Sequence, residues 1–563
     1  MISIFEETRN QLHTAIEKAL NSAMDCADLI KIETKDFVIE VPADTSKGDF
    51  ATNVAMVNVK GFKTAPVKVA EAIVKHFPNE DVEIDRIEIA GPGFINIFMP
   101  KSWFAKMLGD VIDKAENYGR SDYGKGQKVM VEYVSANPTG PMHMGNARGG
   151  AIGDVLAESL SWAGYDTTRE FYVNDAGNQI EKFGISLEAR YIQQLKGEDA
   201  VEFPEDAYHG EDIIEHAKAF IAENGDKYLE CDSETRRKAL IDFALPKNID
   251  KLKVDLGRYR INYDVWFKES TLHPDAINKI LDILTEKGLA YEKEGAIWYK
   301  ATAFGAEKDE VLRRTNGIPT YFAADIAYHY NKFAVRKFDK VINVWGADHH
   351  GHVARLKGAM NAVGLDGDKL DIVLMQLVRL IKDGEPYRMS KRSGKAITLT
   401  NLLEEVPLDA ARFFFIMREP GSTLDFDLDL AVEESSKNPV FYVQYAHARI
   451  CAILKNLKAM GIEPRKLSAE ELNVLDSDSE RELIRALAQL PQVIVTSAKD
   501  YDPAKISTYA STVATAFHKF YTTCRIKDEP DEILYPRLEL CVAAKTVLNN
   551  VLAILKVTAP EVM

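Results

Sequence analysis

The spacing of apolar positions divides the chain into three parts. Residues 1–115 alternate helical stretches with strand-like stretches, which predicts an N-terminal α+β domain. Residues 128–401 place apolar strand-like runs, such as KVINVWG, between runs with helical spacing, the pattern of a doubly wound parallel sheet. From residue 402 to 563 we expect no further strands, and successive amphipathic segments predict an all-α bundle.

Two further boundaries follow from composition. The stretch 116–127 is rich in glycine and charge, and we interpret it as a linker. After residue 175 the pattern becomes long and helical, which predicts a helical insertion in the α/β core at about 176–300. Within that core, KEGAIWYKA is expected to form a short hairpin. The predicted fold class is therefore α/β multidomain.

The central domain opens with an arrangement that is typical of nucleotide binding. A strand-like run, KVMVEYVSA, leads through a loop, NPTGPMHMGN, into a helix, and a second strand-like run, TTREFYVND, follows. Such a loop delivers a ligand to the unpaired N–H groups at the start of the helix. The loop is neither GxGxxG nor a Walker loop, because it carries His143 where those motifs have only glycine or lysine.

Composition and charge narrow the class of protein. The chain is 46% hydrophobic and 28% charged, as ordinary globular proteins are, and no run approaches the length of a membrane span, so we expect no membrane partner. Five scattered cysteines argue against a disulfide framework and suit a reducing cytoplasm. The net charge of −16 speaks against indiscriminate nucleic-acid binding. Residues 441–563 are neutral, which fits a nucleic-acid surface and a dimer interface equally.

Two short strings carry the candidate chemistry. In PMHMGN, Gly145 permits close backbone approach, and His143 and Asn146 supply donors for a phosphate; the alternative is a capping loop with an incidental histidine. In RMSKRSGK, the basic side chains suit a clamp for phosphates; the alternative is a solvated basic loop. The two strings occur in this order and each comes just after a strand, which makes a chance occurrence much less likely.

These strings resemble the two signature motifs of class I aminoacyl-tRNA synthetases, with PMHMGN similar to HIGH and RMSKR similar to KMSKS. The resemblance narrows to the arginyl-tRNA synthetases through NPTGPMHMGNARGGAIGD, GIPTYFAADIAYHY, DAARFF and KGDFATNVA. It implies a Rossmann-like catalytic domain with insertions, an added N-terminal tRNA-binding domain, and a C-terminal helical anticodon-binding (DALR-type) domain. The chain departs from the family pattern at Asn146, where histidine is usual, and at Arg388, where lysine is usual.

The resemblance also implies an activity, arginine–tRNA ligase. L-arginine would be activated with ATP and then transferred to the 3′ end of tRNA(Arg), without a covalent enzyme intermediate. It implies ATP with Mg²⁺, no tightly bound metal, a monomer and a cytoplasmic location. The implied catalytic residues are His143, Asn146 and Lys391. The implied ATP-binding residues are His143, Gly145, Asn146, Arg388, Met389, Ser390, Lys391 and Arg392.

Arginine selection can be argued from chemistry beside the resemblance. A guanidinium pairs bidentately with a carboxylate, and Tyr321 and Asp325 share one face of a predicted helix. Without the resemblance, a surface pair near the core explains them better. The resemblance implies an arginine pocket made of Ser135, Asn137, Asn146, Tyr321, Asp325 and His349.

Three alternatives stay open on the sequence. A class I synthetase for cysteine or methionine would lack the pocket carboxylate, and a non-catalytic synthetase-like tRNA-binding protein would be expected to lose His143 or Lys391. The string GADHHGH offers zinc-ligand types, but it follows a buried strand directly and no distant Cys or His pair completes a set. We therefore interpret His349 as a substrate contact and His352 as structural.

Overall fold

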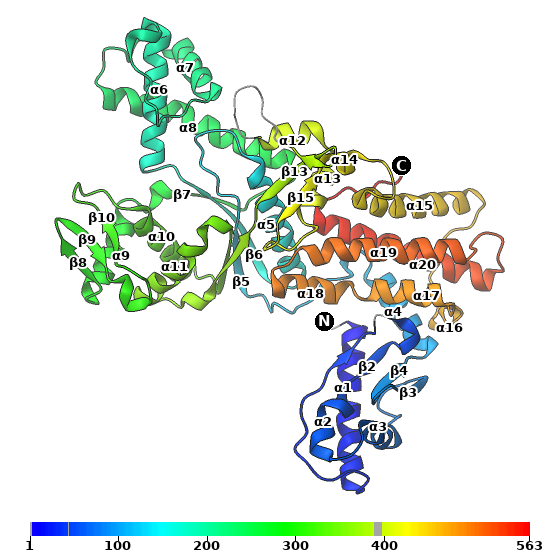
Figure 1. Ribbon diagram of the computed structural model, residues 1–563. Coiled ribbons are helices and arrows are strands. Elements are labelled where there is room, and N and C mark those ends of the chain that lie inside the picture. Colours follow the sequence, from blue (N-terminus) through cyan, green and yellow to red (C-terminus); the bar gives the residue numbers. More distant parts are fainter. Residues whose placement is uncertain (1–2, 43, 388–396) are drawn as a thin grey trace.

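A five-stranded parallel sheet lies at the centre of the computed structural model, which describes residues 3–42, 44–387 and 397–563 (Figure 1). Its strand order is β12-β11-β5-β6-β7. The bounds are β5 Lys128–Glu132, β6 Asp166–Val173, β7 Val265–Lys268, β11 Lys340–Gly346 and β12 Leu370–Met375. The order reverses between β5 and β11, so the sheet is doubly wound as predicted, with a crevice beyond the carboxyl ends of those two strands.

The helix α5, Met144–Trp162, follows β5 and is buried over most of its length. It packs very close to the end of the strand: a Cβ added to Gly153 would lie 2.2 Å from Cγ of Tyr133. A glycine is therefore needed where the helix meets the strand. The predicted strand, loop, helix and strand of residues 128–175 are confirmed.

The chain from 176 to 300 differs from the helical insertion that the sequence predicts. It does contain three helices that project beside the core (Figure 1), α6 Asn178–Lys196, α7 Glu211–Asn224 and α8 Ser233–Arg258. It also contains β7, which pairs with β6 at the edge of the main sheet. The four residues of β7 are too few for their alternation to stand out beside a 26-residue helix.

A second subdomain covers the other side of the crevice. It holds α9 Asp275–Glu286, the hairpin of β8 Ala290–Lys293 and β9 Ala296–Tyr299, the added strand β10 Glu310–Arg313, and the helices α10 Tyr321–Tyr330 and α11 His350–Ala362. A hairpin is present as predicted, but it begins at Ala290, before the predicted segment 293–301, and β10 adds a third antiparallel strand. Residues 331–335 continue α10 as a π-turn.

The sequence predicts no strands after residue 402, and this prediction is wrong. The strand β13, Val378–Lys382, pairs antiparallel with β14, Glu385–Pro386, and parallel with β15, Leu424–Asp427. In β15 the side chains of Leu424 and Phe426 are buried while Asp425 is exposed. This alternation is present in the sequence, but it spans only four residues between helices, namely α12 Leu399–Glu405, α13 Leu408–Phe415 and α14 Leu428–Val432.

The C-terminal part is a bundle of helices. They are α15 Pro439–Ala459, α16 Ala469–Leu472, α17 Asp478–Ala488, α18 Leu490–Asp500, α19 Ala504–Thr523 and α20 Asp531–Leu555. Contrary to expectation, α20 is long and apolar enough to cross a membrane by length and composition alone. However, 72% of its most apolar window is buried inside the protein. It is thus the core helix of the bundle.

The N-terminal domain projects from the bundle (Figure 1). Its antiparallel sheet has the order β1-β2-β4-β3, with bounds β1 Ile39–Glu40, β2 Phe50–Thr52, β3 Arg86–Ala90 and β4 Phe94–Phe98. Its helices are α1 Ile4–Asp25, α2 Val54–Phe62, α3 Pro66–Lys75 and α4 Lys101–Lys114. At the boundary, Arg485 of α17 forms a buried ion pair with Asp49, and its Nε lies 3.1 Å from Asp49 Oδ1. Asp49 belongs to the KGDFATNVA string.

Candidate active site

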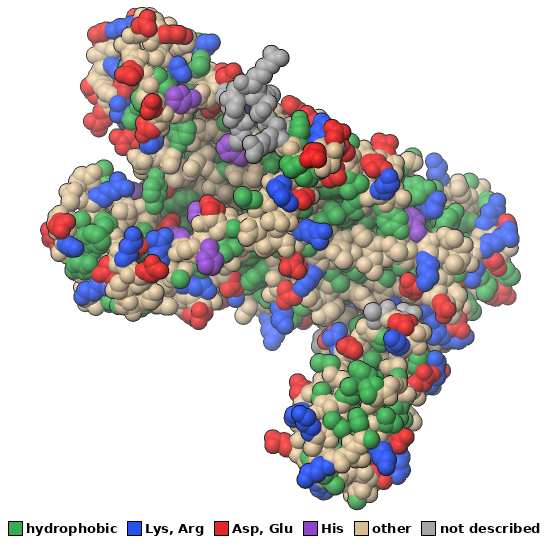
Figure 2. All heavy atoms as spheres, viewed as in Figure 1, with side chains coloured by type: hydrophobic (Ala, Val, Ile, Leu, Met, Phe, Trp, Pro, Cys, Tyr) green, Lys and Arg blue, Asp and Glu red, His purple; other side chains and the backbone are tan. Residues whose placement is uncertain are grey.

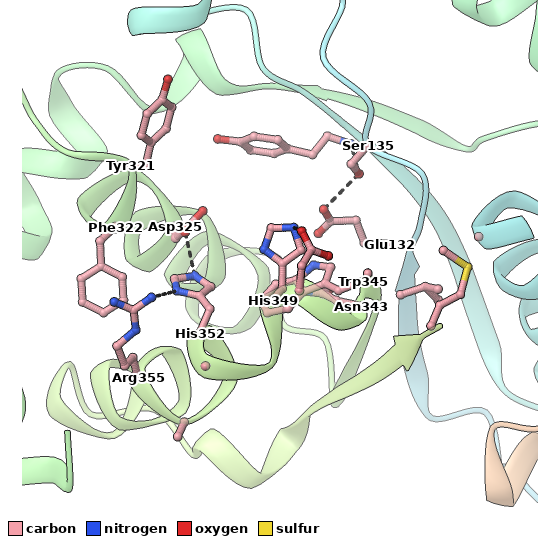
Figure 3. A pocket seen from close by; sticks show the side chains of 18 of the residues that line it. Glu132, Ser135, Tyr321, Phe322, Asp325, Asn343, Trp345, His349, His352 and Arg355 are labelled. Atoms are coloured by element: carbon pink, nitrogen blue, oxygen red, sulfur yellow. Dashed lines mark hydrogen bonds and ion pairs between the residues drawn. The ribbon is translucent and has the colours of Figure 1, made fainter. Parts of the chain in front are cut away.

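A cavity of about 1280 Å³ occupies the crevice beyond β5 and β11 (Figure 3). Its wall combines the loop after β5, the first turn of α5, the helices α10 and α11, and the ends of β11 and β12. Among the predicted site residues, it is lined by Ser135, Gly145, Asn146, Tyr321, Asp325 and His349. Segments from both halves of the doubly wound sheet therefore meet at one place.

The first turn of α5 lies at the edge of this cavity. His143 is the N-cap residue; its backbone is extended and its side chain is exposed and makes no capping hydrogen bond. It is not among the lining residues, although Gly145 and Asn146 are. An exposed donor at a helix start is placed for an anion that approaches from solvent.

The residues that follow the RMSKRSGK string form backbone hydrogen bonds with the PMHMGN string. The N–H of Met144 donates to the carbonyl of Ile397 at 2.8 Å, and the N–H of Leu399 donates to that of Met142 at 3.0 Å. The predicted residues of the motif itself, Arg388, Met389, Ser390, Lys391 and Arg392, lie outside the described residues. Their roles stay predictions.

The loop after β5 is held in an unusual backbone conformation. Val134 and Ser135 have φ values of +68° and +41°, in the left-handed region that side chains other than glycine rarely adopt. The Ser135 hydroxyl donates to Glu132 Oε1 at 3.0 Å and accepts from the N–H of Tyr172 at 3.1 Å. These bonds turn Ser135 toward the cavity. The predicted Asn137 is exposed instead, outside the lining.

Tyr321 and Asp325 both face the cavity from α10, as their spacing predicts (Figure 3). Partial burial raises the pKa of Tyr321, so the phenol stays protonated and able to donate. Asp325 Oδ2 lies 3.0 Å from His352 Nε2, and His352 Nδ1 lies 3.2 Å from Arg355 Nη2. The carboxylate is thus anchored on one side and open to the cavity on the other.

A buried cluster of charged and polar side chains lies next to Asp325. Lys332 is fully buried because the π-turn after α10 directs it inward; its Nζ lies 2.5 Å from Glu132 Oε2 and 3.2 Å from Asn343 Oδ1. His329 donates to the carbonyl of Asp325 at 2.8 Å and accepts from Asn343 Nδ2 at 3.0 Å. Burial holds the pKa of His329 well below its usual value, so the ring is neutral.

No residue of this cluster was predicted from the sequence. Glu132, Tyr172, Asn343, Arg355 and Gln376 line the cavity but were not predicted. One signal was available, since Lys332 follows a helical run that is otherwise mostly apolar, where an unpaired charge is rare.

The ligand-type histidines of the string GADHHGH have different surroundings. His349 lies at the cavity beside Trp345, with 5.8 Å between ring centroids, while His352 points to Asp325. No group of three or more His, Cys, Asp or Glu side chains is placed to hold a metal within residues 3–42, 44–387 and 397–563.

A doubly wound sheet has a HIGH-like helix start at its strand-order reversal, and the sequence also contains the KMSKS-like string RMSKR. Together these features define the catalytic domain of a class I aminoacyl-tRNA synthetase. The family described as tRNA synthetases class I (R), catalytic domain, matches residues 108–433. The family described as arginyl tRNA synthetase N terminal domain matches residues 10–99, and the DALR anticodon binding domain matches residues 443–563.

Whole-chain comparisons give the particular family. The chain is 54% identical to the arginine–tRNA ligases of Acetivibrio thermocellus and of Caldanaerobacter subterraneus, over 100% of each chain. The fold is similar to that of the arginyl-tRNA synthetase of Thermus thermophilus, with a TM-score of 0.71 and 20% identity over 98% of this chain and 100% of the other. The chain belongs to the arginyl-tRNA synthetase family, and its activity is that of an arginine–tRNA ligase.

Proposed function

We propose that the cavity binds L-arginine against Tyr321 and Asp325 and binds ATP along the first turn of α5. The observation that supports this most directly is the Asp325 carboxylate, which faces the cavity and is anchored by His352. A guanidinium presents five N–H donors in a plane and matches such a carboxylate bidentately. A lysine ammonium would pair with it less completely.

We assign the remaining arginine contacts to Ser135, Asn137, Asn146 and His349. Ser135, Asn146 and His349 line the cavity, whereas Asn137 would have to turn inward on binding. The role of Asn146 differs from that of the usual histidine, because an amide donates a hydrogen bond but cannot carry a charge.

The phosphates of ATP are assigned to the N-terminus of α5 and to the second motif. The free N–H groups and the partial positive charge of a helix start favour an anion. At the start of α5, the phosphate contacts are assigned to His143, Gly145 and Asn146. In the RMSKR string, they are assigned to Arg388, Met389, Ser390, Lys391 and Arg392. Catalysis is assigned to His143, Asn146 and Lys391.

The reaction has two steps without a covalent enzyme intermediate. The arginine carboxylate attacks the α-phosphorus of ATP, the bond to the pyrophosphate oxygen breaks, and arginyl-adenylate forms. A terminal ribose hydroxyl of tRNA(Arg) then attacks the arginyl carbonyl and releases AMP. Negative charge grows on the α-phosphate and on pyrophosphate in the first step, so donors from His143, Asn146 and Lys391 lower its barrier.

Mg²⁺ is assigned to the phosphates of ATP. Three of the cavity carboxylates, those of Glu132, Asp325 and Glu310, contact Lys332, His352 and Arg355 respectively, which leaves these three poorly suited to form a dedicated cage. Bound in this way, Mg²⁺ would offset part of the phosphate charge.

The other domains are assigned to tRNA(Arg), and the enzyme to the cytoplasm as a monomer. The bundle would bind the anticodon, and the N-terminal domain would bind a second part of the tRNA. Lys and Arg side chains are scattered among acidic ones over both domains (Figure 2), which favours local basic contacts over a general affinity for nucleic acid.

ATP–pyrophosphate exchange with each amino acid, with and without tRNA(Arg), tests the assignment. Arginine should be the only amino acid that supports exchange. Asp325→Asn should raise the arginine KM strongly. Asp368→Asn, an exposed aspartate beyond α11, is the matched control. His143→Ala and Lys391→Ala should each lower the exchange rate in a folded protein. An unchanged arginine KM in Asp325→Asn would remove the proposed pocket.

A further inference from the structure

We infer that His352 is a positioning residue for arginine specificity, which fixes the Asp325 carboxylate in the plane that a guanidinium requires. The inference rests on the proposed arginine site and names the residue that gives this site its geometry. The sequence alone indicated only a structural role for His352.

The hydrogen bonds around His352 define its tautomer. Arg355 Nη2 lies 3.2 Å from His352 Nδ1, and a guanidinium has only donors. Nδ1 must therefore accept, which places the ring proton on Nε2. That proton is donated to Asp325 Oδ2, 3.0 Å away. His352 is thus a neutral imidazole with one defined donor.

The ring plane is fixed as well as the tautomer. The His352 ring packs edge-on against Phe322, with centroids 5.7 Å apart at 71°, and beside Trp345 at 5.6 Å. Arg355 is itself held by Glu310, with Nη1 at 2.8 Å from Oε1. Contacts from α10, α11, β10 and β11 therefore determine where the Nε2–H points (Figure 3).

Two consequences follow for substrate binding. First, a neutral donor occupies one direction on Oδ2 and leaves the negative charge of Asp325 available to the substrate. Second, it stops the carboxylate from rotating, which matters for a bidentate guanidinium more than for a lysine ammonium, because the ammonium is a point charge. His352 thereby favours arginine over lysine through its effect on Asp325.

Two substitutions at the same position separate this role from simple packing. His352→Leu removes both hydrogen bonds, whereas His352→Gln keeps one donor and one acceptor on a side chain of similar reach. We expect His352→Leu to raise the arginine KM in exchange about 10-fold to 100-fold, the effect of a lost hydrogen bond to a charged group, with kcat and the ATP KM little changed. It should also lower the ratio of arginine to lysine activation, and His352→Gln should recover most of both effects.

The control is His350→Leu, because His350 lies outside the cavity lining two residues before His352. It should behave like the wild type. The inference is overturned if His352→Leu leaves the arginine KM and the arginine-to-lysine ratio unchanged, or if His352→Gln is as impaired as His352→Leu.

Asp325→Asn distinguishes failure of the inference from failure of the proposed site. If Asp325→Asn raises the arginine KM and His352→Leu does not, only the inference fails; if neither does, the arginine site itself is wrong. Should His352→Leu lose its fold by circular dichroism, Arg355→Met replaces it. That variant removes the donor to Nδ1, so a several-fold rise in arginine KM supports the inference and an unchanged arginine KM overturns it.

Discussion

Arg412 and Asp154 form an ion pair in the interior, with 2.6 Å between Nη2 and Oδ2, and join α13 to α5. Both are buried, Arg412 completely. Arg412 also donates from Nη1 to the carbonyl of Tyr259 at 2.8 Å and from Nε to that of Leu555 at 3.0 Å. One side chain of the DAARFF string therefore connects α5, the end of α8 and the last helix of the chain.

Replacement of Arg412 by leucine should destabilise the protein severely. It leaves the Asp154 carboxylate buried without its partner, which costs about 3–5 kcal/mol. Urea unfolding followed by tryptophan fluorescence should show a much lower midpoint. The control is Arg379→Leu, whose pair with Asp425 is exposed and is worth at most about 1 kcal/mol. Equal midpoints in the two variants would contradict the importance of the buried pair.

Gly153→Ala should reduce both stability and arginine activation. The new methyl group would lie 2.2 Å from Cγ of Tyr133, so α5 must move away from β5, at a cost of about 1–3 kcal/mol. The movement would displace the helix start that bears Asn146. Exchange kinetics and thermal unfolding measure the two effects. Gly109→Ala in α4 is the control, since nothing lies within 4 Å of the added methyl group, and it should be neutral or stabilising.

Asp49→Ala should loosen the N-terminal domain from the bundle while arginine activation is retained. Asp49 accepts from Arg485 across the boundary and from the N–H of Met99 at 2.8 Å, so its loss leaves a buried guanidinium unpaired. We expect faster trypsin cleavage near the boundary and a higher KM for tRNA(Arg), with an unchanged arginine KM. Lys101→Ala breaks an exposed ion pair with Asp476 across the same boundary and should change neither quantity measurably.

His329 should make the folded protein less stable in mild acid. Its pKa is far below the unfolded value of about 6.5, so below that pH the unfolded chain binds a proton that the folded ring does not. Stability should fall by up to about 1.4 kcal/mol per pH unit from this residue, until the folded ring also protonates. His329→Gln should flatten the dependence of unfolding temperature on pH between about 6.5 and 5. Parallel wild-type and mutant curves would argue against a neutral buried ring.

The sequence predicted those elements whose side-chain pattern is long enough to define a period. Residues 340–346 form the predicted strand because residues 341–344 are all buried and, apart from Asn343, apolar. The strands β7 and β15 were missed because each has four residues, and their partners, β6 and β13, are distant in sequence. Helical runs on either side also hide such short alternations.

Only those parts of the site that lie in a sequence motif or on one helix could be predicted from the sequence. Tyr321 and Asp325 share a face of α10, so their common orientation followed from the sequence. The partner of Asp325, His352, is 27 residues away, and the partner of Glu132, Lys332, is 200 residues away. Such pairs depend on the tertiary fold, and in the case of Lys332 on a π-turn that no periodicity indicates.

The contact between Arg412 and Leu555 has a consequence for biosynthesis. α5 lies near the start of the central domain, yet part of its packing comes from α18 and α20, near the end of the chain. At roughly 5–20 residues per second, a ribosome needs on the order of 20–70 s to travel from α5 to α20. During that time α5 has no bundle to cover it, so final assembly of the catalytic domain must wait for the last helix to leave the ribosome.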